Sequence, residues 1–262
     1  MNYCVFQAAC ISRIGLIRDK NEDNFIFANQ RLEVENVGLK RALYAEGSTK
    51  DRHIFAVFDG MGGFESGEVA AFTAADFLLN EQMNNKNTAV QPSYFLRQTT
   101  LGMNQAVHHL SSKEKSGRFG TTTAMLYMYL DQVYICNIGD SRIYRMADGV
   151  MTQLSDDDVI YNPELKNQHL TQYIGVDPVK YKIEPHIKKG TVSSDDIFML
   201  CTDGLYNAVP DNEIMKAILH YNRSLPECAE MLADLAEKNG GEDNCTVILM
   251  RFFKYNQKNT VW

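Results

Sequence analysis

Acidic residues recur in this sequence at the ends of apolar segments, where a buried strand would meet solvent. "HIFAVFDGMGG" is an apolar run that reaches Asp59, and "IFMLCTDGL" and "YICNIGDSR" each end on an acid in the same way. "RDKNEDNFIF" and "GGEDNCTVILM" place acids where a strand begins. An Asp–Gly pair alone is a common turn. Five such segments indicate a chemical role for their acids, which are Glu22, Asp23, Asp59, Asp140, Asp203 and Asp243.

Clustered carboxylates repel one another, so a fold that gathers them needs a cation to neutralise them. The candidate ligands are all oxygen atoms, which favours Mg²⁺ or Mn²⁺ over Zn²⁺. Several acids in one cleft can hold two such ions about 3.5–4 Å apart. Gly60 directly follows Asp59 and lets a main-chain carbonyl approach an ion. The pattern therefore predicts a site for two divalent cations.

The elements that must position these acids follow from the periodicity of the sequence. The residue pattern predicts strands over segments 3–12 and 24–28. Segment 31–51 is predicted to be a charged, irregular insertion. Short β-rich runs from "TTTAMLYMYL" to "VMTQLS" predict an antiparallel meander, and 156–168 is a polar excursion after it. "DDIFMLCT" and "NCTVILMRFF" predict later strands. Helices are predicted over 65–80, from near Pro92 onward, over 211–220 and over 225–238. Strands in blocks with helices between them favour an α+β fold in one domain, residues 1–262.

Composition excludes several classes of protein. The chain has 262 residues and a net charge of −7, without a block of Lys and Arg, so a nucleic-acid partner is not expected. Its six cysteines form no CxxC pair and lie mostly in apolar runs, as reduced core residues do. No run is long enough to cross a bilayer, and the N-terminus lacks the pattern of a signal peptide. We therefore expect a cytoplasmic protein without a membrane partner.

Six motifs together resemble those of the metal-dependent Ser/Thr protein phosphatases of the PPM, or type 2C, family, in their bacterial form. They are "RDKNED", "VFDGMGG", "FGTTTA", "NIGDSRIYR", "LCTDGL" and "EDNCTVILM", and they occur in the family's order from about Gly15 to Met250. The resemblance implies an α-β-β-α sandwich, in which two mostly antiparallel sheets are flanked by helices. It also implies hydrolysis of phosphoserine and phosphothreonine in proteins, a kinase that phosphorylates the same substrates, and a monomer.

The resemblance also implies a role for each candidate residue. Asp59 would bridge two ions, Mn²⁺ or Mg²⁺, with the Gly60 carbonyl on one and Asp203 and Asp243 on the other. A water or hydroxide between the ions would attack phosphorus directly. Arg18 would bind the phosphate through its planar guanidinium. Glu22 and Asp23 would act mainly through metal-bound waters. Asp140, with Asp203, would hold a weaker third ion.

Structural alternatives remain for several of these residues. Arg18 can be an ordinary surface arginine, although its spacing to Asp23 favours the phosphate role. Asp140 can instead cap the "GDSR" turn or pair with Arg142. Asn244 is interpreted as a brace for the backbone, and "FGTTTA" as a structural strand.

Two departures from the family pattern affect the mechanism and the substrate. Met61 stands where eukaryotic members commonly carry a histidine, a candidate general acid, and a thioether cannot donate a proton. The segment 156–168 is shorter than the flap of bacterial relatives, which leaves flap-based substrate selection and flap contacts to a third ion open. Two other functions also stay open, namely a non-catalytic binding module of the same fold and a phosphatase of a small phosphomonoester.

Overall fold

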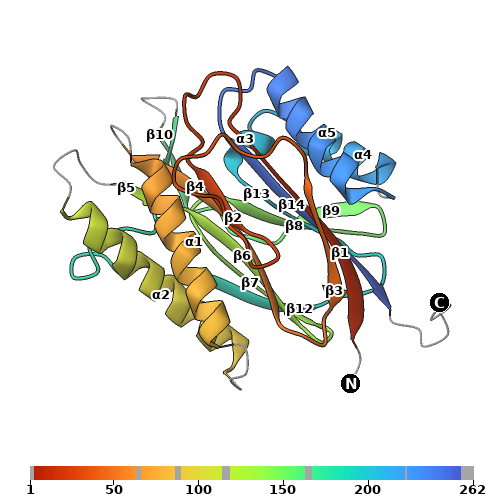
Figure 1. Ribbon diagram of the computed structural model, residues 1–262, viewed down its shortest axis with the longest axis horizontal. Coiled ribbons are helices and arrows are strands. Elements are labelled where there is room, and N and C mark those ends of the chain that lie inside the picture. The colour runs from red at the N-terminus through yellow and green to blue at the C-terminus, as the bar shows by residue number, and fades with distance from the viewer. Residues whose placement is uncertain are drawn as a thin grey trace.

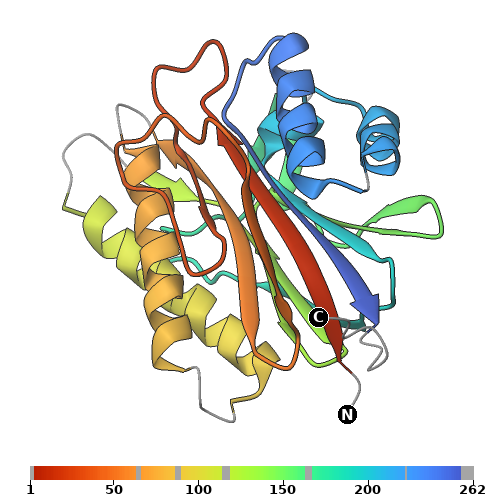
Figure 2. The same ribbon diagram turned by 45° about the vertical axis from the view of Figure 1, so that its right-hand side comes forward.

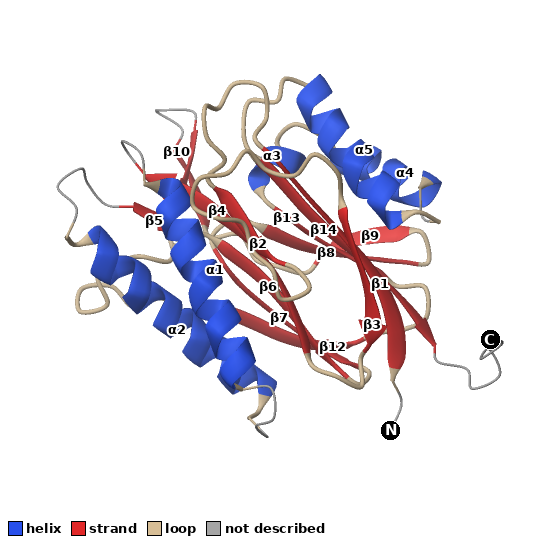
Figure 3. Cartoon of the chain, viewed as in Figure 1, coloured by secondary structure: helices blue, strands red, loops and turns tan. Residues whose placement is uncertain are grey.

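The computed structural model describes residues 3–62, 66–85, 90–113, 119–162, 167–221 and 223–254. Two β-sheets face each other and helices cover both outer surfaces, as Figure 1 and the colouring by element in Figure 3 show. This is the predicted α+β fold, an α-β-β-α sandwich, and the prediction is confirmed. In the described part of the chain, no helix has the length and apolarity needed to cross a membrane.

The first sheet has the strand order β3-β1-β14-β13-β8-β9, and its pairings are antiparallel. β1 and β14 are its longest strands and pair from Cys4 opposite Lys254 to Arg13 opposite Cys245. β1 ends and β14 begins at the end of the sheet where the acids lie. The strands are β1 (Cys4–Arg13), β3 (Leu43–Ser48), β8 (Arg142–Ala147), β9 (Val150–Gln153), β13 (Ile197–Cys201) and β14 (Cys245–Lys254).

The second sheet has the order β12-β7-β6-β4-β2 and is also antiparallel. The short strand β5 pairs with the last residues of β4, and its last residue, Thr121, also forms a bridge with Ile174. A separate hairpin joins β10 and β11. The strands are β2 (Asp23–Ile26), β4 (His53–Gly62), β5 (Phe119–Thr121), β6 (Thr123–Tyr129), β7 (Gln132–Ile138), β10 (Val159–Asn162), β11 (Asn167–Leu170) and β12 (His186–Thr191).

Five helices complete the described elements. α1 (Gly67–Asn84) and α2 (Pro92–Ser111) cover the second sheet, while α4 (Asp211–His220) and α5 (Leu225–Lys238) cover the first. α3 (Asp203–Tyr206) is a single turn directly after β13. Figure 2 shows the two helical layers on opposite sides of the strands. The bounds predicted for α4 and α5 are confirmed.

Three apolar clusters correspond to the three interfaces between these layers. Aromatic rings such as Phe6, Phe55 and Phe198 fill the space between the two sheets. Alanines of α1, among them Ala70 and Ala74, pack closely on the second sheet, because a methyl group keeps the helix near the strands. Apolar residues of α4 and α5 cover the first sheet. Burial of these faces supplies the main stabilising free energy of the fold.

The structure corrects several predictions about elements. The insertion 31–51 contains β3, which pairs with β1 at the edge of the first sheet. The predicted meander is divided, because β6 and β7 belong to one sheet and β8 and β9 to the other. The polar excursion 156–168 contains β10 and the start of β11. The start predicted for the first helix, at residue 65, lies outside the described residues.

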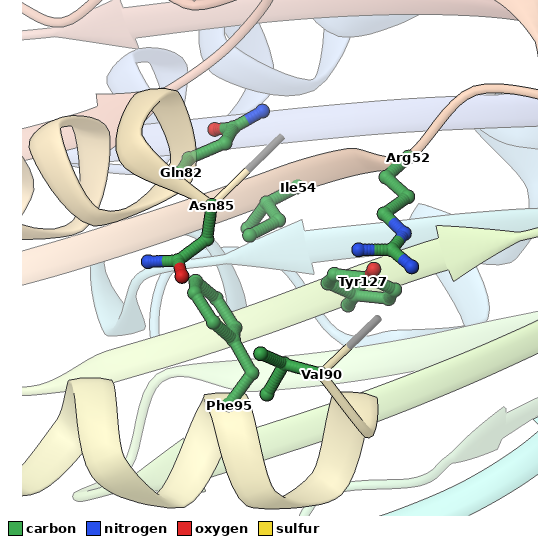
Figure 4. A pocket seen from close by; sticks show the side chains of 7 residues that line it. All are labelled: Arg52, Ile54, Gln82, Asn85, Val90, Phe95 and Tyr127. Atoms are coloured by element: carbon green, nitrogen blue, oxygen red, sulfur yellow. The ribbon is translucent and has the colours of Figure 1, made fainter. Parts of the chain in front are cut away.

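A small cavity lies at the end of β4 opposite Asp59, between the sheet and the ends of α1 and α2 (Figure 4). Ile54 and Tyr127 belong to the sheet, and Gln82 and Phe95 come from the two helices. Its volume of about 20 Å³ has room for roughly one water molecule. This cavity is therefore a packing gap rather than a substrate site.

Candidate active site

Asp59 lies where β4 changes its pairing partner. Residues 53–57 of β4 pair with β6, whereas Gly60–Gly62 pair with β5. Thr122, between β5 and β6, donates its N–H to the Asp59 carbonyl at 2.9 Å, and its Oγ1 accepts from the Asp59 N–H at 3.1 Å. The Asp59–Gly60 pair is not a turn here, because the strand continues to Gly62. This change of pairing partner lies at Asp59, whose side chain lines the cleft.

Asp23 lies opposite Asp59 in the β2–β4 register and is buried beneath the site. Its Oδ2 accepts hydrogen bonds from Thr202 Oγ1 at 2.8 Å and Thr246 Oγ1 at 2.7 Å. Its Oδ1 is buried with no hydrogen-bond partner. Burial raises the pKa of Asp23 to about 8, and the neighbouring Asp243 and Asp203 carboxylates also raise it, although the two threonine hydrogen bonds oppose the shift.

Glu22 and Gly60 are brought together by close backbone contacts. The Gly60 N–H donates to the Glu22 carbonyl at 3.2 Å. A Cβ at position 60 would meet the Gly67 carbonyl, at the start of α1, and would come within 2.5 Å of the Glu22 carbonyl oxygen. Only glycine fits at position 60, because any side chain there would overlap the backbone of Gly67 and Glu22. Burial raises the pKa of the Glu22 carboxyl, and the nearby Glu68 carboxylate adds to the rise.

Asp203 begins α3, immediately after β13. Asn207 Nδ2 donates to Asp203 Oδ2 at 3.0 Å, while Asp203 Oδ1 is buried without a hydrogen-bond partner. Gly204 follows, and any side chain there would collide with the Asn244 carbonyl. Burial raises the pKa of Asp203, and the Asp243 carboxylate raises it further.

Arg18 and Asp243 form an ion pair across the cleft, with Nη2 and Oδ2 separated by 2.8 Å. The two residues are 225 positions apart in the chain. Asn244 fixes the adjacent backbone, because its Nδ2 donates to the carbonyls of Ile14 and Lys20 and its Oδ1 accepts from the Glu22 N–H. The interpretation of Asn244 as a brace is confirmed.

Asp140 lies in the turn between β7 and β8, and its backbone carbonyl accepts from Tyr206 Oη at 2.9 Å. Arg142 does not pair with it. Instead, both Nε and Nη2 of Arg142 donate to Asp157 Oδ2, and the guanidinium lies 3.6 Å from the centre of the Tyr206 ring. Burial raises the pKa of Asp140 to about 7, and the Asp203 carboxylate contributes.

These side chains meet in one cleft of about 250 Å³. Among the described residues, five carboxylates and one guanidinium line it, namely those of Glu22, Asp59, Asp140, Asp203, Asp243 and Arg18. Burial, together with Asp203 and Asp23, raises the pKa of Asp59 well above its ordinary value. Of the predicted site residues, Gly60 also lines the cleft, and Asp23 lies below it. The cleft therefore carries negative charge that its own side chains do not neutralise.

The donor set fits hard divalent cations. All donors are oxygens, and Asp23 Oδ1 and Asp203 Oδ1 are buried acceptors without a hydrogen-bond donor, which suits them to a hard cation. Within the described part of the chain, no three His, Cys, Asp or Glu side chains are arranged so that they could hold an ion as they stand. Arg18 engages Asp243 and Asn207 engages Asp203, so ion binding would require these contacts to rearrange.

Sequence reasoning missed several residues that support the site. Thr122, Tyr206 and Asn207 each contact the backbone or side chain of a predicted acid, and Leu170 of the β11 strand lines the cleft. Thr122 lies in "FGTTTA", whose repeated threonines were a signal of a polar strand end beside the site. The others carry no local signal, because their partners are distant in sequence. Met61, which stands where eukaryotic members commonly carry a histidine, also lines the cleft.

Known proteins resemble this chain in both sequence and fold. The family model "Protein phosphatase 2C" matches residues 43–242. "Serine/threonine phosphatase stp" of Listeria monocytogenes is 30% identical over 251 residues, which are 90% of this chain and 92% of that protein. The chain therefore belongs to the protein phosphatase 2C family, and the predicted class of bacterial protein Ser/Thr phosphatase is confirmed.

Two further similarities extend this comparison. "Serine/threonine protein phosphatase PstP" of Mycobacterium tuberculosis is 27% identical over 271 residues, covering 98% of this chain and 47% of that protein. The crystal structure of the PstP catalytic domain in complex with 2 manganese ions superposes with a TM-score of 0.76 at 26% identity. That alignment covers 95% of this chain and 99% of the other.

Proposed function

We propose that the protein hydrolyses phosphoserine and phosphothreonine in other proteins at a dinuclear site in the acidic cleft. The observation that carries this proposal is the convergence of five carboxylates around one guanidinium, Arg18, in a chain of the 2C family. The PstP catalytic domain, which was crystallised with manganese, supports Mn²⁺ as one metal to test, beside Mg²⁺.

The cleft residues divide into metal-binding and supporting groups. Asp59, Asp203, Asp243 and the Gly60 carbonyl would hold two ions, and Asp140 with Asp203 would hold a weaker third. When bound, the ions would neutralise the carboxylates and acidify a water for attack on phosphorus. Glu22 and Asp23 would orient water near the ions. The buried, raised-pKa carboxyl of Asp23 is suited to this indirect role, because it lies below the cleft.

Arg18 would bind two phosphate oxygens through its guanidinium. Its side chain is 45% exposed and already points across the cleft to Asp243. A phosphate that carries two negative charges competes with one carboxylate for the guanidinium. Arg18 would thus exchange Asp243 for substrate and release Asp243 toward an ion. Met61 offers no proton, so a bound water or another group in the cleft would protonate the leaving oxygen.

The expected surroundings of the enzyme also belong to this proposal. All six cysteines are buried and free, which supports a reducing, cytoplasmic compartment. The partners would be phosphorylated proteins and the kinase that modifies them, and the enzyme would act as a monomer with a single domain over 1–262.

Phosphate release from phosphothreonine, phosphoserine and phosphotyrosine peptides tests the proposal. We expect release from the first two with Mn²⁺ or Mg²⁺, little from the third, and none with EDTA. Equal activity in EDTA would contradict the metal site. Activity on small phosphomonoesters without activity on any peptide would contradict a protein substrate.

A further inference from the structure

A second hollow adjoins the acidic cleft and has no part in the chemistry described above. Its volume is about 610 Å³, and loop 18–22, loop 31–41 and the start of α1 surround it. Figure 1 shows α1 beside β2, the strand that separates these two loops. We call it the Val37 hollow, and its walls include Asp19, Lys20, Val34, Glu35, Val37 and Glu68.

The Val37 hollow and the cleft share a wall. Arg18 and Glu22 line the cleft, whereas the three residues between them line the hollow. A peptide whose phosphate lies against Arg18 therefore has the hollow directly beside its neighbouring residues.

Negative charge dominates this hollow. Asp19 and Glu35 are exposed carboxylates, and within the described part of the chain no cationic side chain pairs with either. Glu68 is nine-tenths buried, and its Oε1 accepts from Lys20 Nζ at 3.0 Å. Its Oε2 is buried without a hydrogen-bond partner. Among the described residues, three carboxylates and one ammonium therefore line the hollow.

Apolar side chains also line the Val37 hollow. Val34, Val37 and Val69 contribute methyl groups, and Val37 as a whole residue is 71% exposed. Long basic side chains combine an aliphatic stem with a cationic head, so they pack along apolar surface while the head reaches an acid. The hollow offers both parts of such a contact.

We infer that the Val37 hollow is a subsite for an arginine or lysine side chain of the phosphoprotein substrate, close in sequence to the phosphorylated residue. The inference rests on the proposed function. Its support is the charge complementarity of the hollow and its continuity with the cleft that would hold the phosphate.

An arginine scan of a substrate peptide tests the inference on the full chain with Mn²⁺. The parent is an alanine-rich phosphothreonine peptide, and each variant carries one arginine at a different position before or after the phosphothreonine. At one or a few positions we expect kcat/KM to rise about three- to tenfold, the effect of one or two exposed ion pairs. The gain should shrink as NaCl is raised, because salt screens exposed charges.

Glu35→Gln and Asp19→Asn remove the charges with little change of shape, and each should move the ratio of kcat/KM between the arginine and alanine peptides toward one. Glu33→Gln is the matched control, because Glu33 is an exposed acid of the same loop that pairs with Arg31 and does not line the hollow. It should leave the ratio unchanged. Equal rates at every arginine position, or a preference that persists when Glu35→Gln and Asp19→Asn are combined in one variant, would overturn the subsite alone. No phosphate release from any peptide would overturn the proposed function and the subsite with it.

Discussion

Asp59 and Asp203 are the residues on which the proposed chemistry depends most. We expect Asp59→Asn and Asp203→Asn each to lower turnover by more than about 100-fold, since even the partners that orient metal ligands are worth about 10–100-fold. The fold should persist, because each substitution removes one charge from a cluster of repelling carboxylates. The melting temperature in chelator should hold or rise. Turnover like that of the unmodified protein at limiting Mn²⁺ would exclude these acids as ligands.

Arg18 has two possible partners, Asp243 and the substrate phosphate. Arg18→Ala should raise KM more than it lowers kcat, because phosphate is bound in both the ground state and the transition state. The loss should be about 1.5–3 kcal/mol, as for a charged hydrogen bond. Steady-state kinetics on a phosphothreonine peptide measures it, with Arg18→Lys as a control that keeps charge without the planar fork. An unchanged KM would mean that Arg18 pairs with Asp243 and does not bind the substrate phosphate.

The turn between β7 and β8 carries Asp140, and a substitution there distinguishes a two-ion from a three-ion mechanism. Asp140→Ala should keep two tightly bound ions and lose most peptide turnover, and added Mn²⁺ should not restore it. Calorimetric Mn²⁺ titration beside a turnover assay distinguishes the cases. Full activity in this variant would mean that Asp140 only shapes the turn.

α3 positions the same turn from the other side. Tyr206→Phe removes the hydroxyl that donates to the Asp140 carbonyl and keeps the ring beside Arg142. We expect affinity for the weakest Mn²⁺ to fall by about tenfold, as for other groups that orient a ligand. The tighter ions should bind as before. Tyr221→Phe, at the end of α4, is the control, and equal titrations for both variants would contradict this role of Tyr206.

At the scale of the whole molecule, the buried acids couple stability to pH when metal is absent. Burial raises the pKa of Asp23 to about 8 and that of Asp140 to about 7, so the folded protein keeps protons that the unfolded chain has released. The free energy of unfolding should therefore fall as pH rises from about 4 to about 8. Thermal melts in EDTA across this range measure the slope.

Two further measurements test whether the acids of the site cause this pH dependence. Mn²⁺ should raise the melting temperature more at pH 8 than at pH 5, because it neutralises the ionised carboxylates. Asp23→Asn should flatten the slope in EDTA. A stability in EDTA that does not change between these pH values would contradict the burial of ionisable acids at the site.

The sequence by itself determined the acids, their positions beside strands and the bounds of the last two helices. These features depend on short-range patterns, such as apolar periodicity and the residues that begin or end a helix. The α+β class followed from the same patterns, and the sandwich from the motif resemblance.

Only the tertiary structure decided how distant segments meet. The change of partner in β4, the place of β3 beside β1, and the division of the predicted meander between two sheets depend on strand pairing far along the chain. Arg18 reaches Asp243 across 225 positions, and the Val37 hollow needs two loops and α1 together. Local sequence patterns do not encode such contacts, because the free energy that selects them comes from packing the whole set of layers at once.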